Sequence, residues 1–218
     1  MEKYLRIGGP VRTPDPKQRW LTFVRNHAKA IVACDCFVVV TATFRTLYVL
    51  VTVELGTRKI LHRNVKAHPT AEWSLQQFRE ALPGGHLYRF VIHGRDSLFS
   101  KELDKAVADM GVRILRTPLR VPLANSACDR LMGTVRRECL DFLILLGERH
   151  LRRILALWTD RYNCGKPHTR LGPHLPVPLQ APLPQNEHRH SLPAGRVVRS
   201  RPVLGGLHRE YWLEKAVA

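Results

Sequence analysis

The sequence predicts an α/β domain with a five-stranded mixed sheet, three antiparallel strands first, flanked by helices and followed by a Pro-rich tail. Three observations support this fold class. Strand-like apolar runs follow one another closely between residues 30 and 65. Helical and strand-like periods then alternate up to about residue 162. Beyond Gly172, prolines recur and the apolar pattern fades.

The first three strands are expected at 30–40, 47–54 and 59–65. The first run, AIVACDCFVVV, is almost continuously apolar and β-branched, which is typical of a central strand buried on both faces. A glycine-containing turn signal follows the second run. Because the connections are short, the three strands are predicted to form an antiparallel meander.

Two capped helices then alternate with two short strands. Thr70 can cap the first helix, whose apolar stripe has a 3.6-residue period and which ends at Pro83. A fourth strand is expected at 88–92. Ser100 can cap the second helix, and a fifth strand is expected at 112–115.

Two longer helices complete the domain. After a Pro-rich loop at 117–123, a helix is expected to begin near Asn125, with an apolar stripe that continues to Leu146. The last helix carries a stripe from Leu151 to Tyr162. The order β-β-β-α-β-α-β-α-α implies helices on both faces of the sheet.

Composition and pattern together divide the chain into three parts. Residues 1–28 are expected to be an irregular lead-in, and 29–172 the core domain. Residues 173–218 are expected to be a Pro-rich basic tail with a short strand or hairpin near 196–204.

The charge balance indicates an acidic partner. The chain has 35 Lys and Arg against 18 Asp and Glu, which gives a formal net charge of +17 at pH 7. Nucleic acid is the first partner to consider for such an excess. An anionic membrane surface is the alternative, but the sequence has no long basic amphipathic helix that would lie on one.

The sequence also favours a cytoplasmic, DNA-associated location. It contains no apolar run of the ~18 residues that a membrane span needs, and its N-terminus lacks the apolar region of a signal peptide. The five cysteines lack the paired spacing of a zinc site, so they are expected to be buried and reduced.

Three carboxylates are candidates for a metal site. Asp35 is embedded in the apolar first strand, where an unpaired carboxylate would be costly to bury. Asp96 follows the fourth strand and Asp129 lies near the start of the long helix. Such carboxylates can converge on divalent Mg²⁺ (or Mn²⁺), and a two-metal cluster supports phosphodiester chemistry. From spacing alone this indication is weak, and Asp35 could instead meet Arg or Lys at a solvated edge.

A family resemblance strengthens the metal interpretation. The segments ACDCF, IHGRDSLFS and NSACDRLMGTVRRECLD resemble the integrase core (DDE-type) domain of insertion-sequence transposases and retroviral integrases. Further matching segments lie in the same order, at 47–49, 54–58, 67–70 and 162–172. The resemblance implies a ribonuclease H-like fold and Mg²⁺- or Mn²⁺-dependent cleavage and joining of DNA at the ends of mobile elements.

Residue by residue, the fit to this family is incomplete. Asp35 falls on the first catalytic Asp, and Asp129 falls on the catalytic Glu with one methylene fewer. Gly94 occupies the position of the second catalytic Asp, at a spacing from Asp129 close to that of the family. Asp96 could replace the missing carboxylate only if the turn rearranged.

This departure leads to an expectation of impaired chemistry, because glycine offers no oxygen ligand to a metal. The first hypothesis is a transposase- or integrase-type polynucleotidyl transferase that is catalytically weak or inactive. The alternative is a non-catalytic basic DNA-binding remnant that modulates a full-length transposase. A nuclease acting on RNA–DNA hybrids is less favoured, because the matching segments are those of integrases.

One amide and several basic residues of the last two helices and the following segment are candidates for DNA contact. Those chosen are Asn125, Arg130, Arg136, Arg137, Lys166 and Arg170. Alternatively, the arginines form a solvated helix face that pairs with Glu138 and Asp141, and Asn125 caps its helix. The expected partners are element-end and target DNA, a homo-oligomer on that DNA, and a separate helix-turn-helix chain for end recognition.

Overall fold

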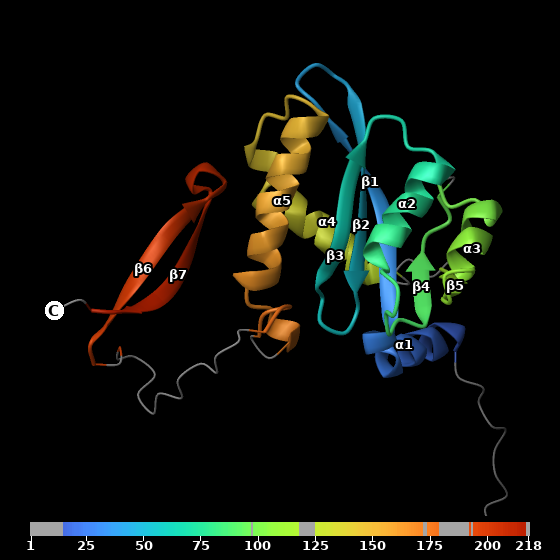
Figure 1. Cartoon of the computed structure of the whole chain (residues 1–218), viewed down its shortest axis with the longest axis horizontal. Helices are drawn as coiled ribbons and strands as arrows, with labels where there is room; N and C mark the ends of the chain where they lie inside the picture. Colours follow the sequence, from blue (N-terminus) through green and yellow to red (C-terminus); the bar gives the residue numbers. More distant parts are fainter. Residues whose placement is uncertain are drawn as a thin grey trace, which may run out of the picture.

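The computed structural model describes residues 15–96, 98–117, 125–171, 174–178, 192 and 194–216. A five-stranded sheet with helices on both faces forms the main body, and a two-stranded sheet stands apart from it (Figure 1). Among the described residues, no helix combines the length and the apolar character that crossing a membrane requires.

The main sheet is mixed. It comprises β1 (Ile31–Val40), β2 (Thr46–Glu54), β3 (Ile60–Lys66), β4 (Phe90–His93) and β5 (Arg113–Arg116), in the order β3-β2-β1-β4-β5. The pairs β1–β2 and β2–β3 are antiparallel, whereas β4 runs parallel to both β1 and β5. The predicted sheet, with three antiparallel strands first, is confirmed.

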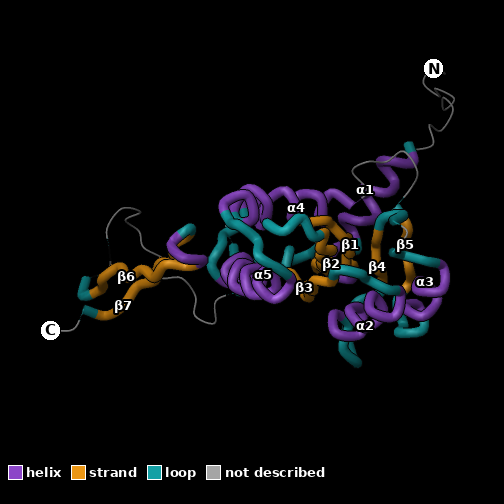
Figure 2. The backbone as a smooth tube through the Cα atoms, turned by 90° about the horizontal axis from the view of Figure 1, so that it is seen from above, coloured by secondary structure: helices purple, strands orange, loops and turns teal. Residues whose placement is uncertain are grey.

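Helices cover both faces, as the continuous burial of the first half of β1 requires. The helices are α1 (Pro16–Asn26), α2 (Ala71–Ala81), α3 (Lys101–Ala108), α4 (Ser126–Glu138) and α5 (Glu148–Cys164). Phe37 and Val39 pack in a cluster with α4 and α5, whereas Val32 and Cys34 pack in a cluster with α2 and α3. Figure 2 shows α1 and α4 on one side of the sheet and α2 and α3 on the other. Asp35 is two residues before Phe37 in the strand, so its side chain lies on the same face, which α4 covers.

The two predicted helix caps are confirmed. The Thr70 side chain accepts a hydrogen bond from the Trp73 N–H at the start of α2, and Ser100 accepts one from Leu103 at the start of α3. Each cap satisfies a backbone donor that the helix leaves unpaired. These caps set where α2 and α3 begin, and therefore where the loop after β4 must end.

The expectation of an irregular lead-in is wrong for residues 16–26, which form α1. Trp20, Phe23 and Val24 pack against the cluster around Ile31 and Phe90. The rings of Phe23 and Phe90 meet edge to face with their centroids 5.1 Å apart. Prolines and charges obscured this short amphipathic helix in the sequence, and burial of its apolar side stabilises it. Residues 1–14 lie outside the described part.

The long helix expected from Asn125 to Leu146 is also shorter than expected. It ends as α4 at Glu138, and a 3-10 turn, Leu140–Phe142, follows. Phe142 and Leu146 are exposed, because the chain turns to bury Leu140 and Leu145 instead. A hydrogen bond of 2.7 Å from the Ala42 N–H to the Leu145 carbonyl fixes this turn against the β1–β2 connection. The sequence here, CLDFLILL, is apolar except for Asp141, so its pattern does not decide which of these side chains are buried.

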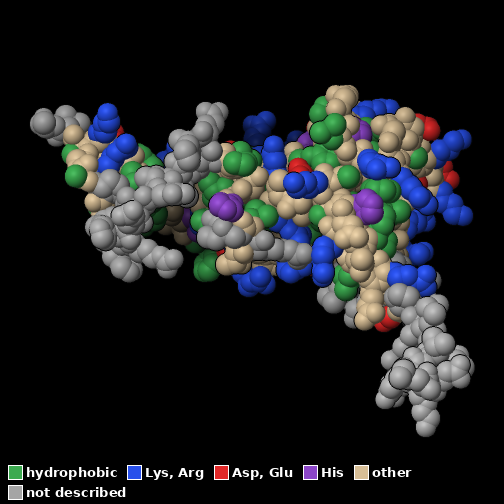
Figure 3. All heavy atoms as spheres, turned by 90° about the horizontal axis from the view of Figure 1, so that it is seen from below, with side chains coloured by type: hydrophobic (Ala, Val, Ile, Leu, Met, Phe, Trp, Pro, Cys, Tyr) green, Lys and Arg blue, Asp and Glu red, His purple; other side chains and the backbone are tan. Residues whose placement is uncertain are grey.

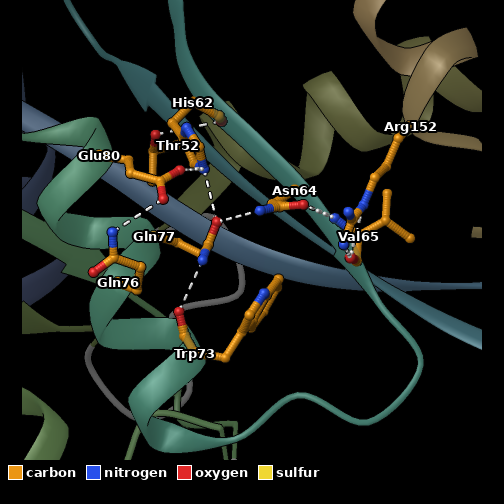
Figure 4. A network of polar contacts seen from close by, with 9 residues as sticks. All are labelled: Thr52, His62, Asn64, Val65, Trp73, Gln76, Gln77, Glu80 and Arg152. Carbon is orange, nitrogen blue, oxygen red and sulfur yellow. Dashed lines mark hydrogen bonds and ion pairs between the residues drawn. The ribbon is translucent and has the colours of Figure 1, made fainter. Parts of the chain in front are cut away.

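Polar side chains join α2 and α5 to the outer strand β3 (Figure 4). The Gln77 Oε1 accepts hydrogen bonds from His62 Nε2 at 2.9 Å and from Asn64 Nδ2 at 2.6 Å. From α5, Arg152 donates to the Val65 carbonyl, at 2.6 Å through Nη2. Asn163 accepts from the Ile60 N–H at 2.9 Å and donates to its carbonyl at 3.0 Å. These bonds pair backbone and buried polar groups that would otherwise be left unsatisfied.

The C-terminal hairpin is formed by β6 (Arg196–Val203) and β7 (His208–Lys215), which pair antiparallel. The expected strand or hairpin near 196–204 contains β6, whereas its partner β7 extends beyond that range. Gly205 and Gly206 have φ of 67° and 97° in the connection, a region that glycine adopts without strain. Much of the Pro-rich segment, and all but the first residue of the predicted loop at 117–123, lie outside the described residues.

The cysteines form no disulfide. Cys34, Cys128 and Cys139 are buried as expected. Cys36 is only half-buried and Cys164 is exposed at the end of α5, so the expectation of burial is wrong for these two.

Candidate active site

Asp35 lies in the middle of the central strand, half-buried and held by amide donors. Its Oδ1 accepts a hydrogen bond from the Cys36 N–H at 2.9 Å, and its Oδ2 accepts one from Asn125 Nδ2 at 3.2 Å. The same Asn125 amide donates to the Cys34 carbonyl at 3.1 Å. Among the described residues, no Arg or Lys forms an ion pair with Asp35. The alternative, in which Arg or Lys pairs with Asp35 at a solvated edge, is therefore not observed in the described part of the chain.

Burial raises the pKa of Asp35 to about 6. The Cys36 N–H opposes this shift, while the negative charges of Asp129 and Asp96 raise the pKa further. The charges of Asp96, in the loop after β4, and of Asp129, in the first turn of α4, thus act on the Asp35 carboxylate of β1. We call these three predicted carboxylates one electrostatic neighbourhood.

Gly94 follows β4 directly and faces Asp35. A Cβ atom built on Gly94 would lie 4.0 Å from Asp35 Oδ1, the one contact within 4 Å among the described residues. Its φ lies outside the left-handed region, so an L-amino acid could take this backbone without strain. There is thus room for a carboxylate beside Asp35, at the position where the family resemblance expects one.

The other two carboxylates are more exposed than Asp35. Asp96 Oδ1 accepts a hydrogen bond from the Leu98 N–H at 3.1 Å, so this side chain stabilises its own turn. Asp129 lies in the first turn of α4, where partial burial raises its pKa and Arg130 opposes the shift. Among the described residues, no three His, Cys, Asp or Glu side chains are grouped for metal binding.

This donor set suits one magnesium ion better than two. Mg²⁺ binds oxygen ligands, commonly one or two carboxylates together with several waters. Asp35 and Asp129 could supply those two carboxylates. A two-metal cluster requires further carboxylates, and the position that would provide one is Gly94.

A buried polar chain that was not predicted supports the Gly94 turn. His93 is buried, and its Nδ1 donates to the Gly94 carbonyl at 2.6 Å. Its Nε2 bonds to Asp104 Oδ1 at 2.9 Å, and Arg116 Nε donates to the other oxygen of Asp104 at 2.6 Å. No sequence signal connects these residues, because they come from β4, α3 and β5.

Several predicted DNA-contact residues have structural partners. Arg136 Nη2 donates to the Val38 carbonyl at 2.8 Å, and Lys166 pairs with Glu138. The Arg137 guanidinium lies over Gly133, where an added Cβ would approach its Nη1 to 2.9 Å. The alternative interpretation, in which these arginines pair with Glu138 and Asp141, is not observed among the described residues, where Glu138 pairs with Arg161 and Lys166 instead.

The remaining candidates differ in role. Asn125 occupies the N-cap position of α4 but makes no side-chain cap bond, because it binds Asp35 and Cys34 instead. Arg130 is exposed and bonds to Ser126. The Arg170 side chain lies outside the described part of the chain.

A basic cleft of about 350 Å³ adjoins the Asp35 region. Asn125 lines it and also binds Asp35, which connects the two. Arg25, Arg58 and Arg130 line the cleft, and none of its described lining residues is acidic. At the end of the molecule where α1 lies, Lys and Arg greatly outnumber Asp and Glu (Figure 3). The cleft therefore provides cations beside the carboxylates, as a bound phosphate chain would require.

A family model matches part of the chain. Residues 110–176 match the family model described as integrase core domain, a segment that includes Asp129 but neither Asp35 nor Gly94. No curated protein matches the sequence.

Solved structures resemble the chain in fold. One is a chain of the cryo-EM structure of the simian T-cell lymphotropic virus intasome in complex with PP2A regulatory subunit B56 gamma, with a TM-score of 0.54 and 12% identity. The similarity covers 87% of this chain and 79% of that chain. At this identity it concerns the fold alone. The predicted ribonuclease H-like fold and the resemblance to integrase cores are confirmed.

Two further structures are more distant. The catalytic core domain of BIV integrase has a TM-score of 0.47 and 11% identity, covering 66% of this chain and 90% of that chain. The HTLV-2 integrase catalytic core domain in complex with magnesium, in its dimeric form, has a TM-score of 0.48 and 11% identity. The similarity covers 65% of this chain and 91% of that chain.

Proposed function

We propose that this protein is a transposase- or integrase-type DNA-binding protein whose metal-dependent cleavage and joining of DNA strands is impaired. One observation carries the proposal. Asp35 and Asp129 share an electrostatic neighbourhood on an integrase-type fold, while the position facing Asp35 is Gly94. Two carboxylates can hold one Mg²⁺ or Mn²⁺, and the missing third weakens a second metal position.

The residues present would have distinct roles in this chemistry. Asp35 and Asp129 would bind the metal ion, which when bound polarises a phosphodiester and lowers the barrier to attack on it. Asn125 would orient Asp35 through its 3.2 Å hydrogen bond. Arg25, Arg58 and Arg130, which line the cleft, would hold the phosphates of the DNA strand beside the carboxylates. Asp96 is a less favourable substitute ligand, because its Oδ1 already binds the Leu98 N–H.

The test is a cleavage assay with restoration of the missing carboxylate. Labelled element-end duplexes and supercoiled plasmid are incubated with Mg²⁺ or Mn²⁺ and the wild-type chain, Gly94→Asp, or Gly94→Asp with Asp129→Glu. We expect weak or no nicking by the wild type and increased nicking by the restored variants. Gly94→Asn serves as the matched neutral control. Efficient strand transfer by the wild type would refute impairment.

The second candidate function is a non-catalytic regulator that occupies DNA or joins mixed oligomers with a full-length transposase. The glycine at position 94 favours this function, because the loss of one metal-binding carboxylate need not affect DNA binding. If Gly94→Asp with Asp129→Glu remains inactive while the wild type binds DNA and inhibits an active relative, this second function is supported.

We also propose that the chain works on DNA as a homo-oligomer in the cytoplasm, with a separate helix-turn-helix chain for end recognition. Support comes from the intasome among the structures of similar fold. Mass photometry of the protein with and without element-end duplex would test this, and a monomer under both conditions would contradict it.

A further inference from the structure

The β6–β7 hairpin has two faces of different character. Residues opposite each other in an antiparallel pair lie on the same face, and successive residues alternate. The register, in which Ser200 is opposite Tyr211, therefore sorts the hairpin into two sets. We name the even-numbered residues of β6 and the odd-numbered residues of β7 the outer face, and the others the inner face.

The inner face is partly covered and its charges are balanced. His208 Nε2 bonds to the Glu138 carbonyl at 2.6 Å, at the end of α4. Arg199 pairs with Glu214 at 2.8 Å, and Arg201 pairs with Glu210 at 2.7 Å. Both carboxylates of the hairpin thus lie on the inner face, each beside an arginine.

The outer face is exposed and only positively charged. All of its residues are exposed. It carries Arg196, Arg209 and Lys215, and no Asp or Glu. Between these cations lie Tyr211, 67% exposed, and Val198, 50% exposed. Two copies that met through this face would bring like charges together, so the face suits a polyanion better than itself.

We propose that the outer face of the β6–β7 hairpin docks into the major groove of duplex DNA. This inference rests on the proposed DNA-binding function and extends it to a second contact surface. Each strand has 8 residues, a length of about 27 Å. The major groove of B-DNA is about 12 Å wide and admits a two-stranded ribbon. The cations reach phosphates at the groove walls, while the hydroxyls of Ser200 and Tyr211 meet base edges.

The position of the hairpin connects this contact to the candidate active site. His208 contacts the last residue of α4, Glu138, and Asp129 lies in the first turn of the same helix. A duplex held by the hairpin is therefore attached to a rigid element that also carries a predicted metal ligand.

The test compares two charge-matched triple variants of the full chain. The outer-face variant combines Arg196→Gln, Arg209→Gln and Lys215→Gln. The control combines Arg79→Gln, Lys101→Gln and Lys105→Gln, three exposed cations of α2 and α3. Binding to a fluorescent duplex is measured by anisotropy over a salt series, and circular dichroism verifies that both variants are folded. A second duplex carries bulky glucosylated hydroxymethylcytosines in its major groove, and netropsin blocks the minor groove of the first.

We expect the outer-face variant to reduce the slope of log K against log salt by about 2–3 units and to raise Kd by about 100-fold at 0.1 M salt. The control should change both much less. Glucosylation should weaken wild-type binding at least tenfold, and netropsin should not. Tyr211→Ala, which keeps every charge, should reduce the preference for the unmodified duplex.

The outcomes separate the two proposals. Equal losses in the two triple variants would overturn the docking of the hairpin and leave the proposed function intact. Sensitivity to netropsin but not to glucosylation would overturn the major-groove assignment. A wild-type chain without salt-dependent DNA binding would overturn both this inference and the proposed function.

Discussion

The substitution Gly94→Asp tests the geometry of the candidate site directly. A Cβ at this position lies 4.0 Å from Asp35 Oδ1, and the backbone tolerates a side chain. A carboxylate there would therefore lie about 5 Å from that of Asp35. At an effective dielectric constant of about 20, two charges at this separation repel by about 3 kcal/mol.

Solvent reduces that repulsion, because the Gly94 turn is only half-buried. At pH 8 in EDTA, we expect Gly94→Asp to have a free energy of unfolding about 1–2 kcal/mol below that of the isosteric Gly94→Asn. Mg²⁺ should reverse the difference, since a ligand at 100 times its Kd stabilises the folded state by about 2.7 kcal/mol.

Urea unfolding of the two variants, in EDTA and in a Mg²⁺ series, provides the measurement. In thermal unfolding, a difference of 1 kcal/mol would appear as a shift in Tm of about 2–4 °C for a chain of this size. Equal stability of the two variants in EDTA, together with equal responses to Mg²⁺, would show that the carboxylates do not meet. The assignment of residue 94 as the missing ligand position would then be wrong.

Three further predictions concern stability and use urea unfolding in EDTA. Because the folded pKa of Asp35, about 6, exceeds its ordinary value of 3.8, the folded state binds more protons, and the contribution of this group to stability falls as pH rises from 4 to 6. Asp35→Asn should remove up to about 3 kcal/mol of that decline, and an unchanged pH profile would contradict it. His93→Ala should cost about 2–4 kcal/mol, because it leaves Asp104 and the Gly94 carbonyl without their buried donor; a loss below 1 kcal/mol would argue against the polar chain. Asn163→Ala should cost about 2–3 kcal/mol by orphaning both backbone groups of Ile60, whereas the exposed neighbour Cys164→Ala should change little, and similar losses in both would count against this explanation.

The sheet was predictable because its strands carry strong local signals. The run over β1 is continuously apolar and β-branched, and the caps Thr70 and Ser100 mark where α2 and α3 begin. Element ends with weak local signals were not predictable. Helix α1 depends on packing against Phe90, and α4 ends at Glu138 because burying Leu145 favours a turn.

The site was only partly predictable for the same reason. The chain pattern and the family resemblance selected Asp35, Asp129 and Gly94, since each stands at a recognisable place beside a strand or helix. They could not reveal that Asn125 binds Asp35 instead of capping α4. Nor could they reveal that His93, at the end of β4, is held by Asp104 from α3.

The sequence alone determined the order of the elements from β1 to α5, the positive charge and the identity of the acidic residues, because these depend on residue type and local period. The tertiary structure decided which of these residues meet. It brought Gly94 to face Asp35, joined the basic cleft to Asn125, and separated the two faces of the β6–β7 hairpin. Such encounters depend on strand register and helix packing between segments far apart in the chain, and no local pattern encodes the distance between them.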